Sequence, residues 1–223
     1  MDHLPVDTLN FLADLMDNNN RDWFKSNKSR YEQSVKEPWE AFVSSVIDTL
    51  SGEEETFGRS AKQSVFRIYR DTRFSKDKTP YKTHISASLA SPTRKAANYA
   101  GYYMQVGAGG IMIGGGAYWL EKDPLYALRE RIKLEPQRIT ELTSEPSFKE
   151  RYGELQGERN KRLPKEFREV QEVQPLILNK QLYYMSELPP EVAVEPGFKD
   201  VVLSHFRAAR PVNAYLNEAI GMQ

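Results

Sequence analysis

The chain has 223 residues, with 31 Lys and Arg against 31 Asp and Glu, and it contains no cysteine. Its length suits one large domain or two small ones, and 39% hydrophobic residues are enough for a buried core. The lack of cysteine excludes disulfides, thiolate zinc sites, iron–sulfur ligation and a cysteine nucleophile. The zero net charge gives no overall basic field of the kind that most nucleic-acid-binding proteins carry.

The N-terminal residues predict neither export nor membrane insertion. The stretch "MDHLPVDTLNFLADL" carries acidic residues where a signal peptide carries basic ones. No stretch of the chain approaches the ~20 apolar residues of a membrane span. We therefore expect a cytoplasmic protein with no membrane partner.

A first helix is predicted near the N-terminus. Leu9, Leu12, Leu15 and Met16 recur at helical spacing and predict one apolar stripe. Asp7 precedes this stripe and is the predicted N-cap, because a carboxylate there can accept hydrogen bonds from free backbone N–H groups. The helical part of the chain is predicted to extend over residues 5–51.

Two more helices are predicted in this N-terminal region. The stretch "RDWFKSNKSRYEQSV" predicts the second helix, with aromatic anchors at Trp23, Phe24 and Tyr31. Pro38 predicts the start of the third helix, since proline fits a first helical turn. Gly52 predicts its end.

The middle of the chain, residues 64–119, is predicted to form strands. The candidate segments are short, rich in aromatic and β-branched residues and bounded by turn residues. The stretch "GAGG" between the last two predicts a hairpin. Because no helical pattern separates the segments, an antiparallel sheet is expected. The four predicted strands cover residues 64–70, 83–91, 99–106 and 111–119.

Helical and irregular structure is predicted over residues 123–223. Asp123 is the predicted N-cap of a helix with Pro124 at its first position. Short helices and loops are expected near residues 144–174, and "QLYYMSEL" is a candidate strand. The last predicted helix bends at Pro211. The simplest account is a single α+β domain over residues 1–223, with helices packing against a mainly antiparallel sheet.

The stretch "RIYRDTRFSKDKTPYK", residues 67–82, is unusually basic. It holds six basic side chains and only two aspartates, a surplus of four positive charges in a chain with zero net charge. If residues 64–70 form a strand, alternate side chains share a face, so Arg70 lies on the same face as Phe66 and Ile68. A guanidinium among core residues needs a carboxylate, backbone carbonyls or an anionic ligand as partner. The basic side chains are Arg67, Arg70, Arg73, Lys76, Lys78 and Lys82.

These residue types are suited to binding a small anion. Guanidinium groups bind phosphates and carboxylates with two hydrogen bonds, and tyrosines can donate a hydroxyl or stack on a ring. Asp71 and Asp77 are candidate catalytic groups, because a carboxylate can orient an arginine, bind a divalent cation or accept a proton. The alternative is a structural lock in which Arg–Asp pairs fix the loop. The predicted ligand-binding residues are Arg67, Tyr69, Arg70, Arg73, Lys78 and Tyr81.

The same stretch carries a family resemblance. The pattern R-x-x-R-D-x-R-F followed by D-K-x-x-Y resembles the signature of a bacterial family known only as domain of unknown function 2461, which has relatives inside longer fungal proteins. The matching positions run from Arg67 to Tyr81, and "FLADLMDNNNRDWF" and "GYYMQVGAGGIMIGGGAYW" extend the resemblance over most of the chain. The resemblance implies that these residues belong together. It implies no activity, cofactor or catalytic residue.

Other motifs were weighed and most point to structure. The stretch "GAGGIMIGGG" lacks the lysine of a phosphate-binding loop and the third glycine of a dinucleotide fingerprint, so it predicts a hairpin and close approach of another backbone. The alternative is that Gly114 to Gly116 form the base of a binding site beside the basic stretch. His84 is a candidate acid–base catalyst or a structural histidine. No two histidines have metal-ligand spacing, so no metal site is predicted, and no cofactor is specified.

Two functional hypotheses follow. The first is an enzyme or sensor that binds a small phosphate- or carboxylate-bearing ligand at residues 67–82. The second is a non-catalytic module that contacts nucleic acid or a protein partner through the same stretch. Nucleic acid requires a longer basic track, and the zero net charge favours the small ligand. The sequence does not specify an oligomeric state.

Overall fold

The computed structural model describes residues 1–53, 60–89 and 99–221. It has an α+β fold in which helices at both ends of the chain flank a four-stranded antiparallel sheet of order β1-β2-β3-β4. The predicted fold class is therefore confirmed. The strands are β1 (His84–Leu89), β2 (Gly101–Gly107), β3 (Gly110–Ala117) and β4 (Leu182–Leu188).

The chain forms two compact units. The first comprises Met1–Leu89, Tyr103–Ile113 and Glu187–Leu203, and the second comprises Ala90–Tyr102, Gly114–Ser186 and Ser204–Gln223. The single domain over residues 1–223 stays a prediction.

In the first unit, helix α1 (Val6–Asp17) differs from its predicted stripe. Its buried residues are Thr8, Phe11, Leu12 and Leu15, which follow the i, i+3, i+4, i+7 spacing of one helical face. Met16 is 56% exposed, so its place in the stripe was wrong. Asp7 as N-cap was also wrong, because Pro5 holds that position. The Asp7 carboxylate lies in the first turn of the helix and accepts from Arg30 Nη2 at 2.5 Å.

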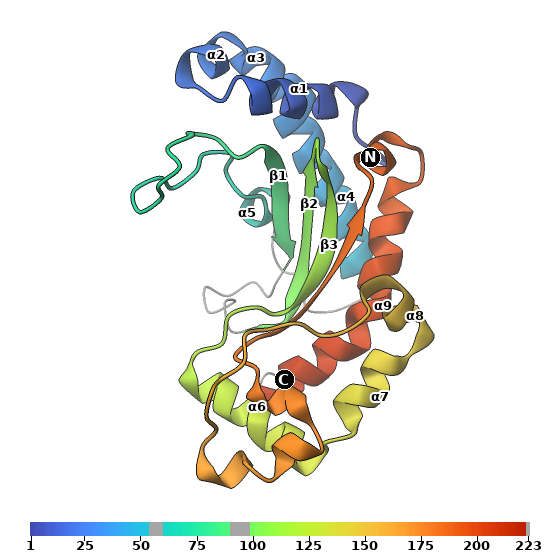
Figure 1. Cartoon of the computed structure of the whole chain (residues 1–223). Coiled ribbons are helices and arrows are strands. Elements are labelled where there is room, and N and C mark those ends of the chain that lie inside the picture. The colour runs from blue at the N-terminus through green and yellow to red at the C-terminus, as the bar shows by residue number, and fades with distance from the viewer. Residues whose placement is uncertain (54–59, 90–98, 222–223) are drawn as a thin grey trace. The chain divides into compact units, whose positions relative to one another are not determined.

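The second predicted helix is broken into shorter pieces. Asn20 caps its start by accepting a hydrogen bond from the backbone N–H of Trp23, and Asn27 ends its first piece. The third helix confirms the prediction, with Pro38 in its first turn and Gly52 as C-cap. The elements are α2 (Arg21–Ser26), α3 (Lys28–Tyr31), the π-helical turn η1 (Glu32–Lys36) and α4 (Glu37–Ser51). Figure 1 shows α4 behind β2 and β3 of this unit.

The predicted strand at residues 64–70 was wrong. A capping box between Ser60 and Gln63 starts a helical turn, α5 (Ala61–Ser64), where the strand was expected to begin. The next residues pair with the chain only at isolated bridges, Val65 with Ala87 and Tyr69 with Tyr81. Two extra residues lie between the bridges on the second strand, so a continuous ladder cannot form.

The glycines around β2 and β3 support the structural interpretation of "GAGGIMIGGG". A two-residue turn joins β2 to β3, which confirms the predicted hairpin. In the second unit, a Cβ on Gly114 would lie 2.3 Å from the Tyr184 carbonyl oxygen, and one on Gly115 would lie 2.1 Å from that of Gly101. These glycines are needed for close backbone approach, as predicted.

The second unit contains the remaining helices and the strand predicted at "QLYYMSEL", which is β4. The predicted N-cap, Asp123, and the predicted first position, Pro124, each lie two residues too late, since Glu121 caps the helix and Lys122 begins it. Pro211 lies inside the last helix. The helices are α6 (Lys122–Leu134), α7 (Arg138–Ser144), α8 (Pro146–Tyr152) and α9 (Phe198–Ala219), the last beginning in the first unit, with 3-10 turns η3 (Lys165–Phe167), η4 (Val170–Glu172) and η5 (Pro175–Leu178); η6 (Pro190–Val194) belongs to the first unit.

Candidate functional site

The basic stretch forms an irregular hairpin that leads into β1. We call residues 65–69 and 80–87 its stem and residues 70–79 its tip. Three backbone hydrogen bonds hold the stem, from Phe66 to Ser86, from Lys82 to Ile68 and from Arg70 to Pro80, at 2.8 to 2.9 Å. In Figure 1 this segment extends to the left from the start of β1.

Aromatic packing anchors the stem to the N-terminal helices. The Tyr81 ring stacks on Phe24 with 4.1 Å between centroids and 16° between planes. The Asn19 side chain donates to the Tyr81 carbonyl at 3.0 Å and accepts from its N–H at 3.1 Å. Ile68 is buried beside this contact. Backbone, aromatic and amide contacts therefore hold the stem without an ion pair among the described residues.

The tip is held by its own ion pairs. Arg70 Nη1 lies 2.5 Å from Asp77 Oδ2 and also donates to the Thr79 hydroxyl. Arg73 Nη2 lies 2.6 Å from Asp71 Oδ2. Lys78 Nζ donates to the Thr72 carbonyl at 2.8 Å. Four predicted site residues, Arg70, Asp71, Arg73 and Asp77, are therefore brought together as two internal pairs.

These pairs lower the pKa of both carboxyl groups. Hydrogen bonds from Arg70, and then from Thr79, lower the pKa of Asp77 to about 2. Hydrogen bonds from Arg73 lower the pKa of Asp71 well below its usual range. A carboxylate with a lowered pKa is a weak proton acceptor at neutral pH. The geometry therefore favours the orienting role for Asp71 and Asp77, and a catalytic role for either stays a prediction.

Arg67 and Lys82, both in the stem, form no ion pair with a described carboxylate, although the charge of Arg67 contributes to lowering the pKa of Asp71. No Asp or Glu of the described ranges lies within ion-pair distance of either side chain. Burial lowers the pKa of Lys82, and the nearby positive charge of Arg67 lowers it further. Lys82 Nζ lies over the Phe66 ring, 5.2 Å from its centroid. Phe66 is 45% exposed, so its predicted place in the core was wrong.

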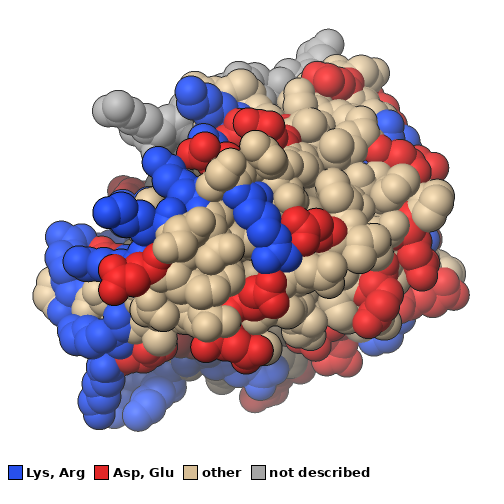
Figure 2. Space-filling model, turned by 90° about the horizontal axis from the view of Figure 1, so that it is seen from above, with Lys and Arg blue, Asp and Glu red and all other residues tan. Residues whose placement is uncertain are grey.

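Figure 2 shows Lys and Arg side chains gathered along its left side, the side on which Figure 1 draws the hairpin. Arg67, Arg73, Lys76 and Lys78 are all exposed. Because Arg70 and Arg73 are paired with the two aspartates, the four surplus charges of the stretch belong to Arg67, Lys76, Lys78 and Lys82.

His84 lies near Lys82, at the start of β1. Burial, and then the charge of Lys82, lowers the pKa of His84 below its usual 6.5, so the imidazole is neutral at pH 7. Its Cβ lies 3.2 Å from the position of a Cβ built on Gly107, so the glycine leaves room next to the ring. The structure thus brings predicted residues Arg67 and His84 to the same part of the hairpin.

Polar side chains on β1 and β2 extend this region, and sequence reasoning missed all of them except His84. Tyr103 Oη donates to Gln105 Oε1 at 2.8 Å, and Tyr103 also bonds to the Ser86 side chain. We call His84, Ser86, Tyr103 and Gln105 the polar sheet face. The alternation of buried and half-buried residues along β2 is the signal that could have found Tyr103 and Gln105.

The two predicted tyrosines differ in their surroundings. Tyr81 is buried against Phe24, so its ring is already used in packing. Tyr69 is 50% exposed and its ring lies 5.3 Å from that of Tyr81. Of the two, Tyr69 has a surface free to contact a ligand.

The described residues contain neither a cluster of metal ligands nor a membrane-spanning helix. Across residues 1–53, 60–89 and 99–221, no group of three or more His, Asp or Glu side chains is arranged to hold a metal ion. No helix in the same ranges is both long enough and apolar enough to cross a bilayer.

Comparison with known proteins gives a family and no activity. Searches of curated proteins and of solved structures found no match. The comparison with protein families matches residues 7–215, which include the hairpin, the sheet and most of α9. The chain therefore belongs to the family described as "Conserved hypothetical protein (DUF2461)".

Proposed function

We propose that the protein binds a small phosphate- or carboxylate-bearing ligand at the stem of the hairpin, through Arg67, Lys82 and His84. The observation that carries this proposal is the pair of neighbouring cations, Arg67 and Lys82, without a carboxylate partner in the described residues. Like charges held side by side repel each other, and an anion bound between them removes that repulsion.

The surroundings of the pair suit a compact anion. Arg67 can offer a two-pronged guanidinium, and half-buried Lys82 can offer a point charge. Tyr69, half exposed and bridged to Tyr81 in the same stem, is the side chain available to stack on a planar ring. The polar sheet face supplies hydroxyl and amide groups for the uncharged part of a ligand.

His84 is the group placed to handle a proton if the bound ligand reacts. Its pKa is lowered by burial and by Lys82, so it is unprotonated at pH 7 and can accept a proton. A bound anion would raise this pKa by offsetting the Lys82 charge.

A thermal-shift screen tests the proposal. Nucleotides, sugar phosphates, polyphosphate and dicarboxylates are added with and without divalent metal. A ligand at 100 times its Kd stabilises by about 2.7 kcal/mol, which for this chain length raises Tm by about 5–11 °C. Arg67→Gln and Lys82→Gln should each remove the shift, whereas Lys76→Gln, which removes an exposed cation of the tip, should keep it. No shift with any anion, or equal shifts in all variants, would contradict the proposal.

A second candidate function is favoured by the tip. Phe74 is 95% exposed and has Arg73 over its ring at 5.9 Å. An exposed aromatic ring among cations suits a non-catalytic module that contacts nucleic acid or an acidic protein partner, with the Arg–Asp pairs as a structural lock. Nucleic-acid binding would weaken steeply with salt and would require Phe74. The predicted cytoplasmic location is compatible with both functions.

A further inference from the structure

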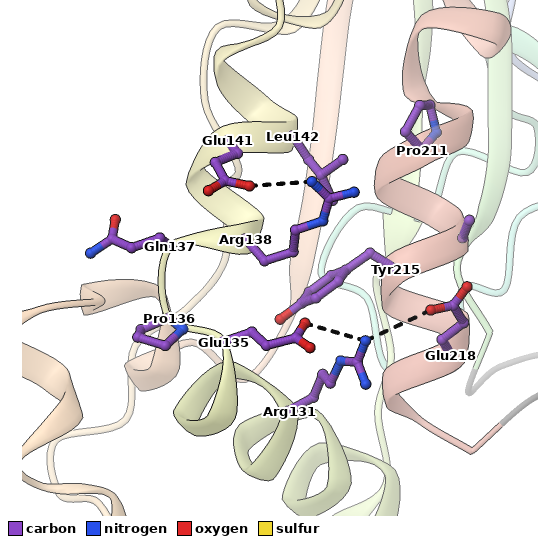
Figure 3. A pocket seen from close by; sticks show the side chains of 11 residues that line it. Arg131, Glu135, Pro136, Gln137, Arg138, Glu141, Leu142, Pro211, Tyr215 and Glu218 are labelled. Carbon is purple, nitrogen blue, oxygen red and sulfur yellow. Dashed lines mark hydrogen bonds and ion pairs between the residues drawn. The ribbon is translucent and has the colours of Figure 1, made fainter.

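A second candidate site lies in the other unit, away from the basic hairpin in sequence. Side chains from α6, from α7 and from the C-terminal part of α9 line a cavity of about 630 Å³. This volume lies within the ~300–1,000 Å³ of small-molecule sites. Figure 3 shows the Tyr215 side chain crossing from α9 towards the connection between α6 and α7, with its hydroxyl in the space between the labelled side chains.

Two buried polar atoms on this wall have no hydrogen-bond partner among the described residues, the Tyr215 hydroxyl and Arg131 Nε. The Tyr215 residue is only 5% exposed, so bulk water does not satisfy its hydroxyl. Burial raises the pKa of Tyr215 to about 12, which keeps the hydroxyl protonated at neutral pH. An N–H of arginine can only donate, and the phenol can donate as well. Both atoms can therefore be satisfied by one acceptor oxygen.

The rest of the wall offers carboxylates in excess of cations. Glu135 lies 3.2 Å from Arg131 and Glu141 lies 3.2 Å from Arg138. Glu218 lies 4.0 Å from Arg131, and the Glu218 side chain is 64% exposed. The Arg131 guanidinium is already paired with Glu135. Glu218 is thus the carboxylate most available to an added cation.

We propose that this cavity binds the zwitterion of an amino acid, either free or as a short peptide. The ligand carboxylate accepts from Arg131 Nε and the Tyr215 hydroxyl, and the ligand ammonium pairs with Glu218. Neither an anion alone nor an amine alone meets both sets of groups. The apolar parts of the wall, Leu142, Pro211 and the Tyr215 ring, lie beside the space left for a side chain.

Calorimetric titration of the full chain with trialanine and with free alanine tests this inference. Binding of trialanine in the millimolar range or tighter is expected, and N-acetyl-trialanine and trialanine amide, each lacking one terminal charge, should bind at least ~10-fold more weakly. Stronger binding of free alanine than of trialanine would show that the cavity prefers a free amino acid to a peptide. No binding of either probe at millimolar concentration, or equal binding of the blocked peptides, overturns the proposal.

Two variants connect binding to the atoms named. Tyr215→Phe should weaken binding about 10-fold without lowering Tm, because it removes a hydroxyl that lacks a protein partner. Arg131→Lys, which keeps the charge and removes Nε, should also weaken binding. Tyr152→Phe is the matched control, since the buried Tyr152 hydroxyl donates to the His205 carbonyl at 2.8 Å. It should lower Tm and leave binding unchanged. Unaltered binding in Tyr215→Phe would contradict the assigned contact.

Discussion

The stem and the tip of the basic hairpin are stabilised in different ways. The stem is held by backbone hydrogen bonds, by Tyr81 on Phe24 and by the Asn19 side chain. The tip is held by Arg70 on Asp77 and by Arg73 on Asp71. No ion pair among the described residues holds the stem, whereas the tip uses both of its arginines in ion pairs.

This difference separates two uses of the same residue type. An arginine paired with a neighbouring aspartate contributes local order and little net charge. Arg67 and Lys82 have no such partner in the described residues, so their charges remain available to an anion. The stem is therefore the candidate binding region, and the paired residues of the tip are candidates for a structural role that fixes the loop.

The largest expected effect comes from the aromatic anchor of the stem. Phe24→Ala should destabilise the protein by about 3–5 kcal/mol, because it empties a buried site under Tyr81. Urea unfolding followed by circular dichroism measures the change. Phe74→Ala, which removes an exposed ring, is the control and should leave stability within about 0.5 kcal/mol. A small loss in Phe24→Ala would mean that the stem is anchored elsewhere.

A smaller loss is expected when the amide contact of the stem is removed. Asn19→Ala leaves the N–H and the carbonyl of Tyr81 without their side-chain partner. The cost should be about 1–3 kcal/mol, from two partly buried backbone groups. Urea unfolding gives the free energy, and amide exchange at Tyr81 should accelerate. Unchanged exchange would show that the Asn19 contact does not protect the stem.

The ion pairs of the tip should contribute less than either stem contact. The Arg70 side chain is 28% exposed and that of Asp77 is 57% exposed, so solvent screens their attraction. Arg70→Ala should destabilise by about 1 kcal/mol and Arg73→Ala by less, since the Arg73 pair is more exposed. A loss of several kcal/mol in Arg70→Ala would show that the lock extends into the core.

The smallest expected effect is on the titration of Asp77. Its folded pKa of about 2 lies below the usual 3.8, so the stabilisation from this group is complete above pH ~3.8 and is lost as pH falls through 2. Carboxyl NMR resonances followed against pH measure the folded value. Arg70→Ala should raise the pKa of Asp77 towards 3.8. An unchanged value in this variant would mean that Arg70 is not its main partner.

The sequence predicted the fold class, the hairpin between β2 and β3 and the limits of α4, because periodicity, turn glycines and proline act locally. It could not predict which arginines would be paired. Arg70 meets Asp77 only after the tip turns back, so the contact depends on the folded loop.

The strand predicted over residues 64–70 failed because α5 extends to Ser64 and the two-residue mismatch between the bridges interrupts the ladder after it. Tyr103 and Gln105 escaped prediction because a strand pattern shows which side chains share a face and does not show what lies beside that face. The candidate cavity of the second unit depends on contacts between α9 and helices distant in sequence, which no local pattern encodes.

The most direct test of the anion-binding stem is an NMR titration of His84 with and without inorganic phosphate. In the free protein the pKa of His84 should lie below 6.5, and phosphate should raise it in the unmodified chain and leave it unmoved in Arg67→Gln. If phosphate leaves the pKa of His84 unchanged in the unmodified chain, or raises it equally in Arg67→Gln, the account is contradicted.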